Sequence, residues 1–211
     1  MKSLVNNSLF SGHKMKCMTF FTALLLSPVL YGCGEAAAES STITIDKDGR
    51  ISYVIFEDFE QDYYDSDELK SMAEREIDEY NAGYDEARVT LEDTKLIESD
   101  DNRRVRLTMS FSSCEDFSNF NREELFYGTV QEAGLKGYDV SESLIDNDGI
   151  RIESSYLNDN KDKHVIISGA AARVVAPYNI VYMSKEVSLT GKKEAALSPG
   201  FEGDIQLLLS K

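Results

Sequence analysis

Hydrophobic and polar residues alternate along much of the chain, and this alternation predicts β-strands. Thr42–Ile45 places apolar side chains at every second position, and the largely apolar segment Ile51–Phe56 predicts a second strand. The four residues between them, Asp46-Lys47-Asp48-Gly49, are typical of a turn, so the two segments predict a hairpin. A second alternating pair is expected at residues 89–98 and 105–112, where one side of each strand enters the core.

The stretch between Asp65 and Gly83 shows helical spacing instead. Its apolar side chains recur three or four residues apart and share one face of a helix: Leu69, Met72, Ala73, Ile77, Tyr80 and Tyr84. Asp65, with Glu68 three residues later, fits a capping box at the start, and Gly83 is placed to end the helix. The opposite face is charged and is expected to meet solvent.

The second half of the chain is mostly strand-like as well. Short apolar runs predict five strands: Ile150–Glu153, His164–Ser168, Arg173–Ala176, Asn179–Met183 and Ile205–Leu209. Between the halves, residues 114–125 are expected to form a short helix, and Phe126–Val130 a returning strand. Strands on both sides of one clear helix predict an α+β fold, a mostly antiparallel sheet packed against one main amphipathic helix.

A different hydrophobic pattern occupies the start of the chain. Met18–Tyr31 is a predominantly apolar run of 14 residues, and no acidic residue precedes Glu35. The residues before the run include three lysines, Lys2, Lys14 and Lys16. A basic flank, an apolar run and then small residues are typical of a secretory signal. Because a membrane-spanning helix needs about 20 residues, a permanent span is disfavoured.

The end of this signal, Leu30-Tyr31-Gly32-Cys33, resembles the lipobox of bacterial lipoproteins, which is Leu, a variable small residue, Gly or Ala, and Cys. Tyr31 departs from the pattern because it is bulkier than the usual residue. The resemblance implies cleavage between Gly32 and Cys33, a diacylglyceryl group on the sulfur of Cys33, and anchoring at the extracytoplasmic face of the cell membrane. The alternative is an ordinary secreted protein in which Cys33 is incidental.

These signals divide the chain into residues 1–32 as a lipoprotein signal peptide, 33–42 as a tether and 43–211 as a single extracytoplasmic domain; a start at Met15 would shorten the signal. Removal of the signal takes away three lysines and no acid, which leaves 19 basic and 38 acidic residues and a net charge of −19. Such a surface repels phosphate backbones, so nucleic acid is excluded as a partner. An extracellular protein or a polysaccharide fits better.

An acidic segment that also contains aromatic residues precedes the predicted helix. The candidate ligand rim within it consists of Asp58, Asp62, Tyr63, Tyr64 and Asp65. Aromatic rings that stack and carboxylates that accept hydrogen bonds would suit a sugar or a cation. The structural alternative is a loop before a helix whose first turn favours acidic side chains.

The sequence contains no complete motif for catalysis or for binding a cofactor. His164 is the one histidine after the signal, which excludes a His-rich zinc site, and the residues around Cys114 do not support a nucleophile paired with it. Residues 46–49 and 146–149 share an Asp-x-Asp-Gly pattern but lack the last ligand of an EF-hand loop, so they predict hairpin turns. No cofactor and no metal site are predicted.

Three phrases, Phe56-Glu57-Asp58-Phe59, Asp67–Lys70 and Leu125–Val130, resemble a group of small uncharacterised lipoproteins of Gram-positive gut bacteria. The resemblance implies envelope anchoring and brings no catalytic or ligand residues. With the acidic, tyrosine-rich exterior, it predicts a membrane-anchored, non-enzymatic binding or interaction module. An extracytoplasmic, glycosidase-like hydrolase that uses paired carboxylates is the alternative, because 38 acidic residues contain every spacing. A purely structural envelope protein is a third interpretation.

Overall fold

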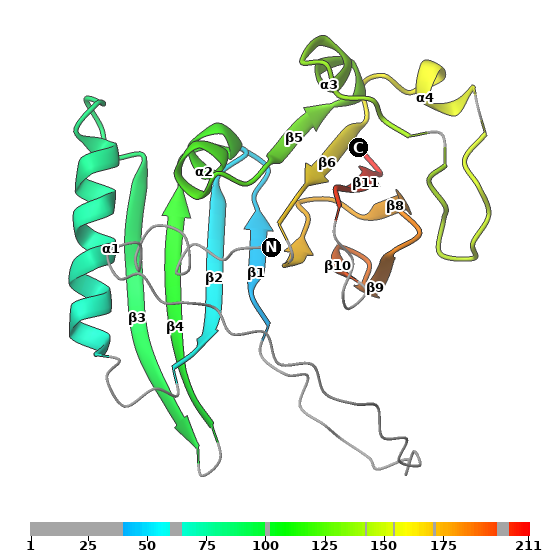
Figure 1. The fold of residues 1–211 in the computed structure, drawn as a ribbon. Coiled ribbons are helices and arrows are strands. Elements are labelled where there is room, and N and C mark those ends of the chain that lie inside the picture. The colour runs from blue at the N-terminus through cyan, green and yellow to red at the C-terminus, as the bar shows by residue number, and fades with distance from the viewer. Residues whose placement is uncertain are drawn as a thin grey trace, which may run out of the picture. The chain divides into compact units, whose positions relative to one another are not determined.

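The strands of the described chain form two β-sheets, whereas the sequence predicted one (Figure 1). The computed structural model describes residues 40–59, 65–99, 102–141, 143–153, 155–170, 172–197 and 203–211. The strands are β1 (Thr42–Ile45), β2 (Ile51–Asp58), β3 (Val89–Ser99), β4 (Asn102–Phe111), β5 (Leu125–Thr129), β6 (His164–Ser168), β7 (Arg173–Val175), β8 (Ile180–Met183), β9 (Val187–Gly191), β10 (Glu194–Leu197) and β11 (Ile205–Leu209). The helices are α1 (Ser66–Asn81), α2 (Cys114–Asn121), α3 (Val130–Leu135) and α4 (Tyr156–Asp159).

The larger sheet has seven strands in the order β3-β4-β2-β1-β7-β10-β9, and the smaller has four in the order β5-β6-β11-β8. Neighbouring strands pair antiparallel throughout, except for β1 and β7, which run parallel with Thr42 opposite Arg173. Turn residues join the sheets, since the backbone N–H of Ile180 on β8 donates to the carbonyl of Lys192 beyond β9 at 2.8 Å.

The alternation seen in the sequence places one face of the larger sheet in a core. On β4 the side chains of Val105, Leu107, Met109 and Phe111 are buried. Aromatic rings gather above the ends of these strands. Phe117 of α2, which is fully buried, makes edge contacts with Phe111 and Tyr53 at ring-centroid distances of 5.2 and 5.4 Å. These ring contacts form an aromatic cluster in the core under α2.

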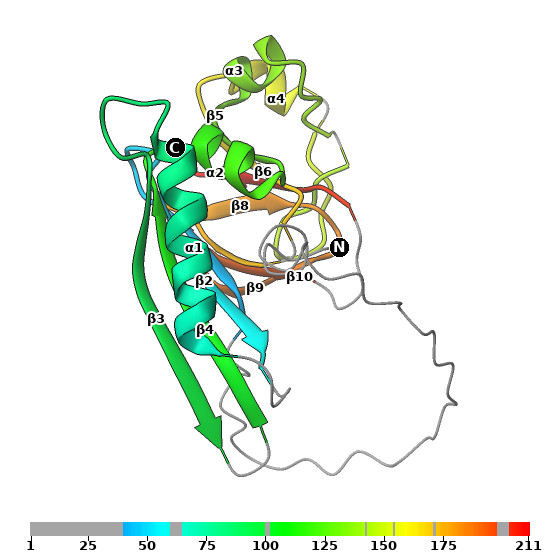
Figure 2. The same ribbon diagram turned by 60° about the vertical axis from the view of Figure 1, so that its left-hand side comes forward.

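Helix α1 lies along β3, as the two ribbon views show together (Figure 2). Its N-cap is Asp65, whose Oδ1 accepts hydrogen bonds from the backbone N–H groups of Asp67 and Glu68 at 2.7 and 3.1 Å. The side chains that it buries, Leu69, Ala73 and Ile77, form the predicted stripe. Tyr84, which we expected on that stripe, lies beyond the helix and is 43% exposed.

Helix α2 connects the two sheets, because it contacts β4 of the larger sheet and β5 of the smaller one. The hydroxyl of Ser118 accepts a hydrogen bond from the backbone N–H of Leu125 at 3.0 Å and donates to its carbonyl oxygen at 3.2 Å. Ser113 caps the helix by accepting from the N–H of Asp116. The buried Asp116 carboxylate in turn accepts from the hydroxyl of Tyr80 on α1, so α1 and α2 are tied together.

The smaller sheet has its own, mainly aliphatic core. Its buried members come from β5, β6, β11, α3 and the segments between them: Phe126, Ala133, Leu144, Ile152, Val165, Ile167 and Leu208. Partly buried apolar side chains pack around this cluster and include Val130, Tyr138, Val140 and Leu157. These outer members reach solvent, which places an apolar surface next to α3 and α4.

The predicted mixed fold with mainly antiparallel pairing is confirmed. The expectation of one main helix against one sheet is wrong, since the described residues contain four helices and two sheets. Helices α3 and α4 were not predicted, because six and four residues are too few to show a hydrophobic period in the sequence.

Several strand predictions are confirmed with their bounds, among them β6 and β11. The strand expected at Ile150–Glu153 is wrong, because Arg151 makes only an isolated bridge to Ile145. The hairpin formed by β9 and β10 was not predicted, since Val187–Gly191 and Glu194–Leu197 are short segments without strict alternation.

Candidate functional site

The acidic rim predicted before α1 is only partly within the described residues. Asp62, Tyr63 and Tyr64 lie outside them, as do Gly32 and Cys33 of the lipobox. The two described members of the rim have structural roles. Asp65 caps α1, and the carboxylate of Asp58 lies 3.6 Å from Nε of Arg104 on the neighbouring strand. The structural alternative, a loop before a helix, accounts for Asp65, whereas Asp58 is the last residue of β2.

The two Asp-x-Asp-Gly segments form the same turn. In each, Oδ1 of the first aspartate accepts two backbone N–H groups, from Asp48 and Arg50 in the first turn at 2.8 and 2.9 Å. The second turn repeats these bonds from Asp148 and Ile150 to Asp146 at 2.9 and 2.8 Å. The glycines adopt positive φ angles of 81° and 78°, which only glycine adopts readily. The leading carboxylates are therefore used by the turns, as predicted.

Cys114 and His164 each contact Tyr127 but make no contact with each other that would pair them. The thiol makes a backbone hydrogen bond with Tyr127, while the imidazole stacks on the Tyr127 ring at 5.2 Å between centroids. Burial raises the pKa of Cys114 to about 12. The thiolate, which is the reactive form, is therefore scarce at neutral pH, and the geometry gives no support to a nucleophile activated by His164.

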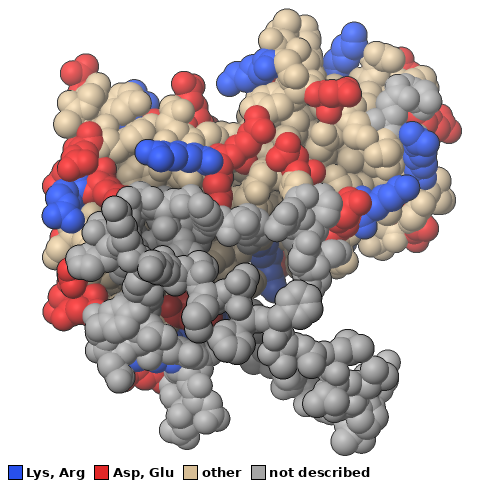
Figure 3. Space-filling model, viewed as in Figure 1, with Lys and Arg blue, Asp and Glu red and all other residues tan. Residues whose placement is uncertain are grey.

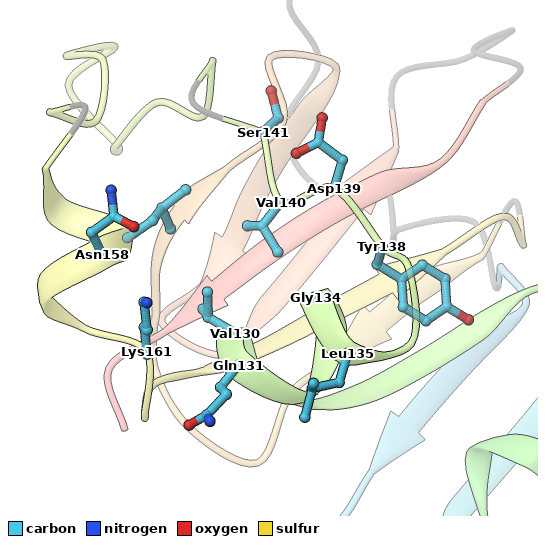
Figure 4. A pocket seen from close by; sticks show the side chains of 11 residues that line it. Val130, Gln131, Gly134, Leu135, Tyr138, Asp139, Val140, Ser141, Asn158 and Lys161 are labelled. Carbon is cyan, nitrogen blue, oxygen red and sulfur yellow. The ribbon is translucent and has the colours of Figure 1, made fainter.

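A solvent-open groove lies between α3 and α4. Its main cavity has a volume of about 670 Å³. The apolar part of its lining is Val130, Leu135, Tyr138, Val140 and Leu157, and the polar part is Gln131, Asp139, Ser141, Asn158 and Lys161. Figure 4 shows Val130 and Val140 pointing toward each other, with the ring of Tyr138 turned away from both.

Local hydrogen bonds fix the helix that forms one wall of this groove. Thr129 and Glu132 make a capping box at the start of α3, in which each side chain bonds to the other residue's backbone N–H. The hydrogen bonds from Thr129 lower the pKa of Glu132. The next two N–H groups, of Val130 and Gln131, donate to carbonyls of the segment after α4. The wall is thereby attached to the segment opposite.

A second, more acidic cavity of about 410 Å³ adjoins the first, and the two share Tyr138 and Asp139. Its charged and polar lining residues are Glu124, Lys136, Tyr138, Asp139, Asp204 and Gln206. A Cβ atom built on Gly169 would lie 3.0 Å from Oδ1 of Asp204 and 3.8 Å from Cβ of Glu124, so these two acidic side chains approach one point. We call the two cavities together the α3 groove.

Tyr138 separates the two halves of the α3 groove. Its ring packs on Phe126 at 4.8 Å between centroids. Burial, a side-chain hydrogen bond with Glu124 and the negative charges of Glu124 and Asp204 raise the pKa of Tyr138 to about 12. The phenol is therefore protonated at neutral pH and donates its hydrogen bond to the Glu124 carboxylate.

The loop that follows Tyr138 is held by one side chain of the sheet below it. Gln206 on β11 donates from Nε2 to the carbonyl of Asp139 at 2.9 Å, and its Oε1 accepts from the N–H of Ser141 at 2.7 Å. This pair of bonds, across more than 60 residues of sequence, fixes the loop that lines both cavities.

None of the α3 groove residues was predicted as a site from the sequence. One local signal was available, since Thr129-x-x-Glu132 matches a capping box and indicates that a helix starts where we expected the strand Phe126–Val130 to end. The rest of the α3 groove brings together residues 124, 130–141, 157–161 and 204–206. No local pattern reports that arrangement.

Charged side chains of both signs are spread over the visible face in Figure 3 rather than gathered in one field. Within the described residues, no group of three or more histidine, cysteine or acidic side chains has the geometry of a metal site. No helix in the same part of the chain is long and apolar enough to cross a membrane. Comparisons with known protein families, curated proteins and solved structures found no match.

Proposed function

We propose that this chain is a membrane-anchored extracytoplasmic lipoprotein whose folded part is a non-enzymatic binding module. The observation that carries the binding role is the α3 groove, an open concave surface. Its larger half, called the apolar half below, combines apolar and polar side chains, and its smaller half is acidic. At its margin Leu135 is 82% exposed, whereas most leucines of the described chain are buried. Concave surfaces that combine apolar side chains with a few polar groups are typical of ligand-binding sites.

The anchor is supported by the lipobox-like sequence that ends at Cys33. Eight residues lie between Cys33 and Thr42, where the first strand begins. Because one residue spans at most about 3.6 Å, this segment keeps the first strand within about 30 Å of a lipid on Cys33. The binding module would therefore act close to the membrane surface.

A hydrolase with paired carboxylates is the second candidate, and one observation favours it. The acidic half of the α3 groove is concave, and both Glu124 and Asp204 line it, which is the arrangement that a hydrolase with paired carboxylates would use. A general acid at neutral pH, however, usually needs a carboxyl group withdrawn from water. Glu124, Asp139 and Asp204 are all exposed, so they suit the binding of a cation better than proton donation.

Labelling with radioactive palmitate tests the anchor. The full-length chain, expressed in bacteria, should incorporate the label, and Cys33→Ser should abolish it because the acyl groups depend on that sulfur. Cys17→Ser is the matched control, since Cys17 lies within the predicted signal, and it should label normally. Label retained in Cys33→Ser, or lost equally in Cys17→Ser, would contradict the anchor.

Activity measurements separate binding from hydrolysis. Glu124→Gln and Asp204→Asn keep the size of each side chain and remove its charge. A hydrolase would lose its activity on aryl glycosides by orders of magnitude in these variants. A binding module has no such activity to lose, so turnover that depends on Glu124 or Asp204 would favour the second candidate.

A further inference from the structure

We propose that the α3 groove recognises a peptide segment of a partner protein in which apolar side chains stand next to lysine or arginine. This inference rests on the proposed binding function and assigns the class of partner. The two halves of the α3 groove differ in chemistry, and the one occupant that satisfies both carries an apolar group and a positive charge a few ångströms apart.

The apolar half offers side chains that are already desolvated on one side. Val130, Val140 and Leu157 are partly buried against the core of the smaller sheet, so their outer surfaces form a floor continuous with that core. Leu135 stands at the margin and is 82% exposed. Covering these surfaces with an apolar side chain of a partner removes them from water and favours binding.

The acidic half supplies charge complementarity. Three of its lining side chains are carboxylates, those of Glu124, Asp139 and Asp204. The one cation among its lining residues, Lys136, lies over the ring of Phe126 at 5.7 Å from the centroid. A second cation, Lys161, lines the other cavity. The excess of negative charge is thus confined to one half, and a cationic group is expected there.

The α3 groove is also held in place before a partner arrives. Gln206 fixes the loop at Asp139 and Ser141, and the capping box of Thr129 fixes the start of α3. Tyr138 donates to Glu124, which orients one carboxylate of the acidic half. A fixed surface loses less conformational entropy on binding, and this favours recognition of a short segment.

A single small amine would occupy only the acidic half, and an uncharged apolar molecule only the other half. The cavities of about 670 and 410 Å³ adjoin through Tyr138 and Asp139, so a chain of residues can occupy both. A peptide segment is the ligand that presents the two groups at neighbouring positions.

The test uses full-length protein in a non-ionic detergent and a six-residue peptide, acetylated and amidated, in which two leucines precede two lysines. Binding is measured by fluorescence polarisation with an uncharged dye. Two matched peptides replace the lysines by glutamates or the leucines by serines. We expect the leucine–lysine peptide to bind at least about tenfold more tightly than either, and to weaken as salt is raised.

Protein variants locate the site. Leu135→Ser should weaken the leucine–lysine peptide about tenfold, and the double variant Glu124→Gln/Asp204→Asn about fivefold. The controls are Ile150→Ser, which alters an isoleucine that is 63% exposed outside the α3 groove, and Glu79→Gln/Glu115→Gln, which removes two exposed charges elsewhere. Both control proteins should bind as the wild type does.

Several outcomes would overturn the inference. If the glutamate or the serine peptide binds as tightly as the leucine–lysine peptide, the protein does not recognise the apolar and the positively charged side chains together. If spermidine competes as strongly as the unlabelled peptide, the protein recognises charge alone. Equal losses in the test and control variants would place the site elsewhere. Palmitate labelling of the same protein reports the anchor separately: labelled protein that does not bind the peptide overturns this inference and leaves the anchor in place.

Discussion

The two sheets differ in how their helices cover them. Against the larger sheet, α1 has 16 residues and α2 has eight, and the aromatic side chain of Phe117 on α2 closes over Phe111 and Tyr53. Against the smaller sheet, α3 and α4 have six and four residues, and an open groove lies between them. The same chain therefore builds one covered core and one core whose edge reaches solvent.

This difference separates stability from recognition. A long amphipathic helix buries a continuous stripe and leaves little apolar surface on its outer face. A helix of one or two turns cannot cover a sheet, so side chains such as Val140 and Leu157 stay partly exposed unless a partner covers them. We expect substitutions in the aromatic cluster to act on folding and substitutions in the α3 groove to act on binding.

The largest expected effect is that of Phe117→Ala. The side chain is fully buried between Phe111 and Tyr53, and its loss leaves a cavity that should lower the free energy of unfolding by about 3–5 kcal/mol. Urea denaturation measures the change. Phe117→Leu should lower the free energy of unfolding by less than half as much as Phe117→Ala does. A loss below about 1 kcal/mol would mean that the aromatic cluster does not stabilise the larger sheet.

Next comes Asn81, the last residue of α1. Its Oδ1 accepts from the N–H groups of Arg88 and Val89 at 2.8 and 3.1 Å, and its Nδ2 donates to the carbonyl of Val89 at 2.8 Å. Asn81→Ala should lower the free energy of unfolding by about 1–3 kcal/mol, because these bonds align β3 with α1.

The matched control for this prediction is Asn119→Ala, which changes an exposed asparagine of α2 and should cost less than about 0.5 kcal/mol. Equal costs at the two positions would show that the bonds of Asn81 add nothing to the attachment of α1.

A smaller effect is expected at the start of α1. Asp65→Ala removes the acceptor of two backbone N–H groups and should cost about 1 kcal/mol, measured by the same denaturation. Asp65→Ser keeps an acceptor at the N-cap and should cost only a few tenths. A ligand-binding role for Asp65 without a capping role would instead leave stability unchanged in both variants.

The stability of α3 should depend on pH. The pKa of Glu132 is lowered in the folded state, so its bonds with Thr129 add stability above the ordinary glutamate value of 4.5. That contribution is lost as the pH falls below 4.5 through the lowered value. Carboxyl NMR should give a midpoint below 4.5 for Glu132, and Thr129→Val should move it upward. An unmoved midpoint would contradict the role assigned to the capping box.

The smallest expected effect on stability is that of Leu135→Ser. Because the side chain is 82% exposed, its replacement should change the free energy of unfolding by less than about 0.5 kcal/mol. A loss above about 1 kcal/mol in urea denaturation would show that Leu135 stabilises the fold. The comparison between a covered and an open core would then no longer hold.

Local patterns in the sequence determined much of the secondary structure. Period-two alternation predicted β1 and β4, and runs of apolar residues predicted β2, β6 and β11. Asp65 predicted the first turn of α1 through its side-chain acceptor. The two turns that begin at Asp46 and Asp146 were also readable, because the aspartate and the glycine act within five residues of each other. These signals are local, so the residues that carry them are close in sequence.

Only the tertiary structure decided how those elements combine. The division into two sheets, the parallel pairing of β1 with β7 and the α3 groove all join segments that are far apart in sequence, as Gln206 and Asp139 illustrate. Such contacts are selected by the packing free energy of the whole core rather than by the period or cap of any one segment. The acidic rim shows the converse, since Asp58 and Asp65 looked like ligands in the sequence and are engaged by Arg104 and by α1 in the fold.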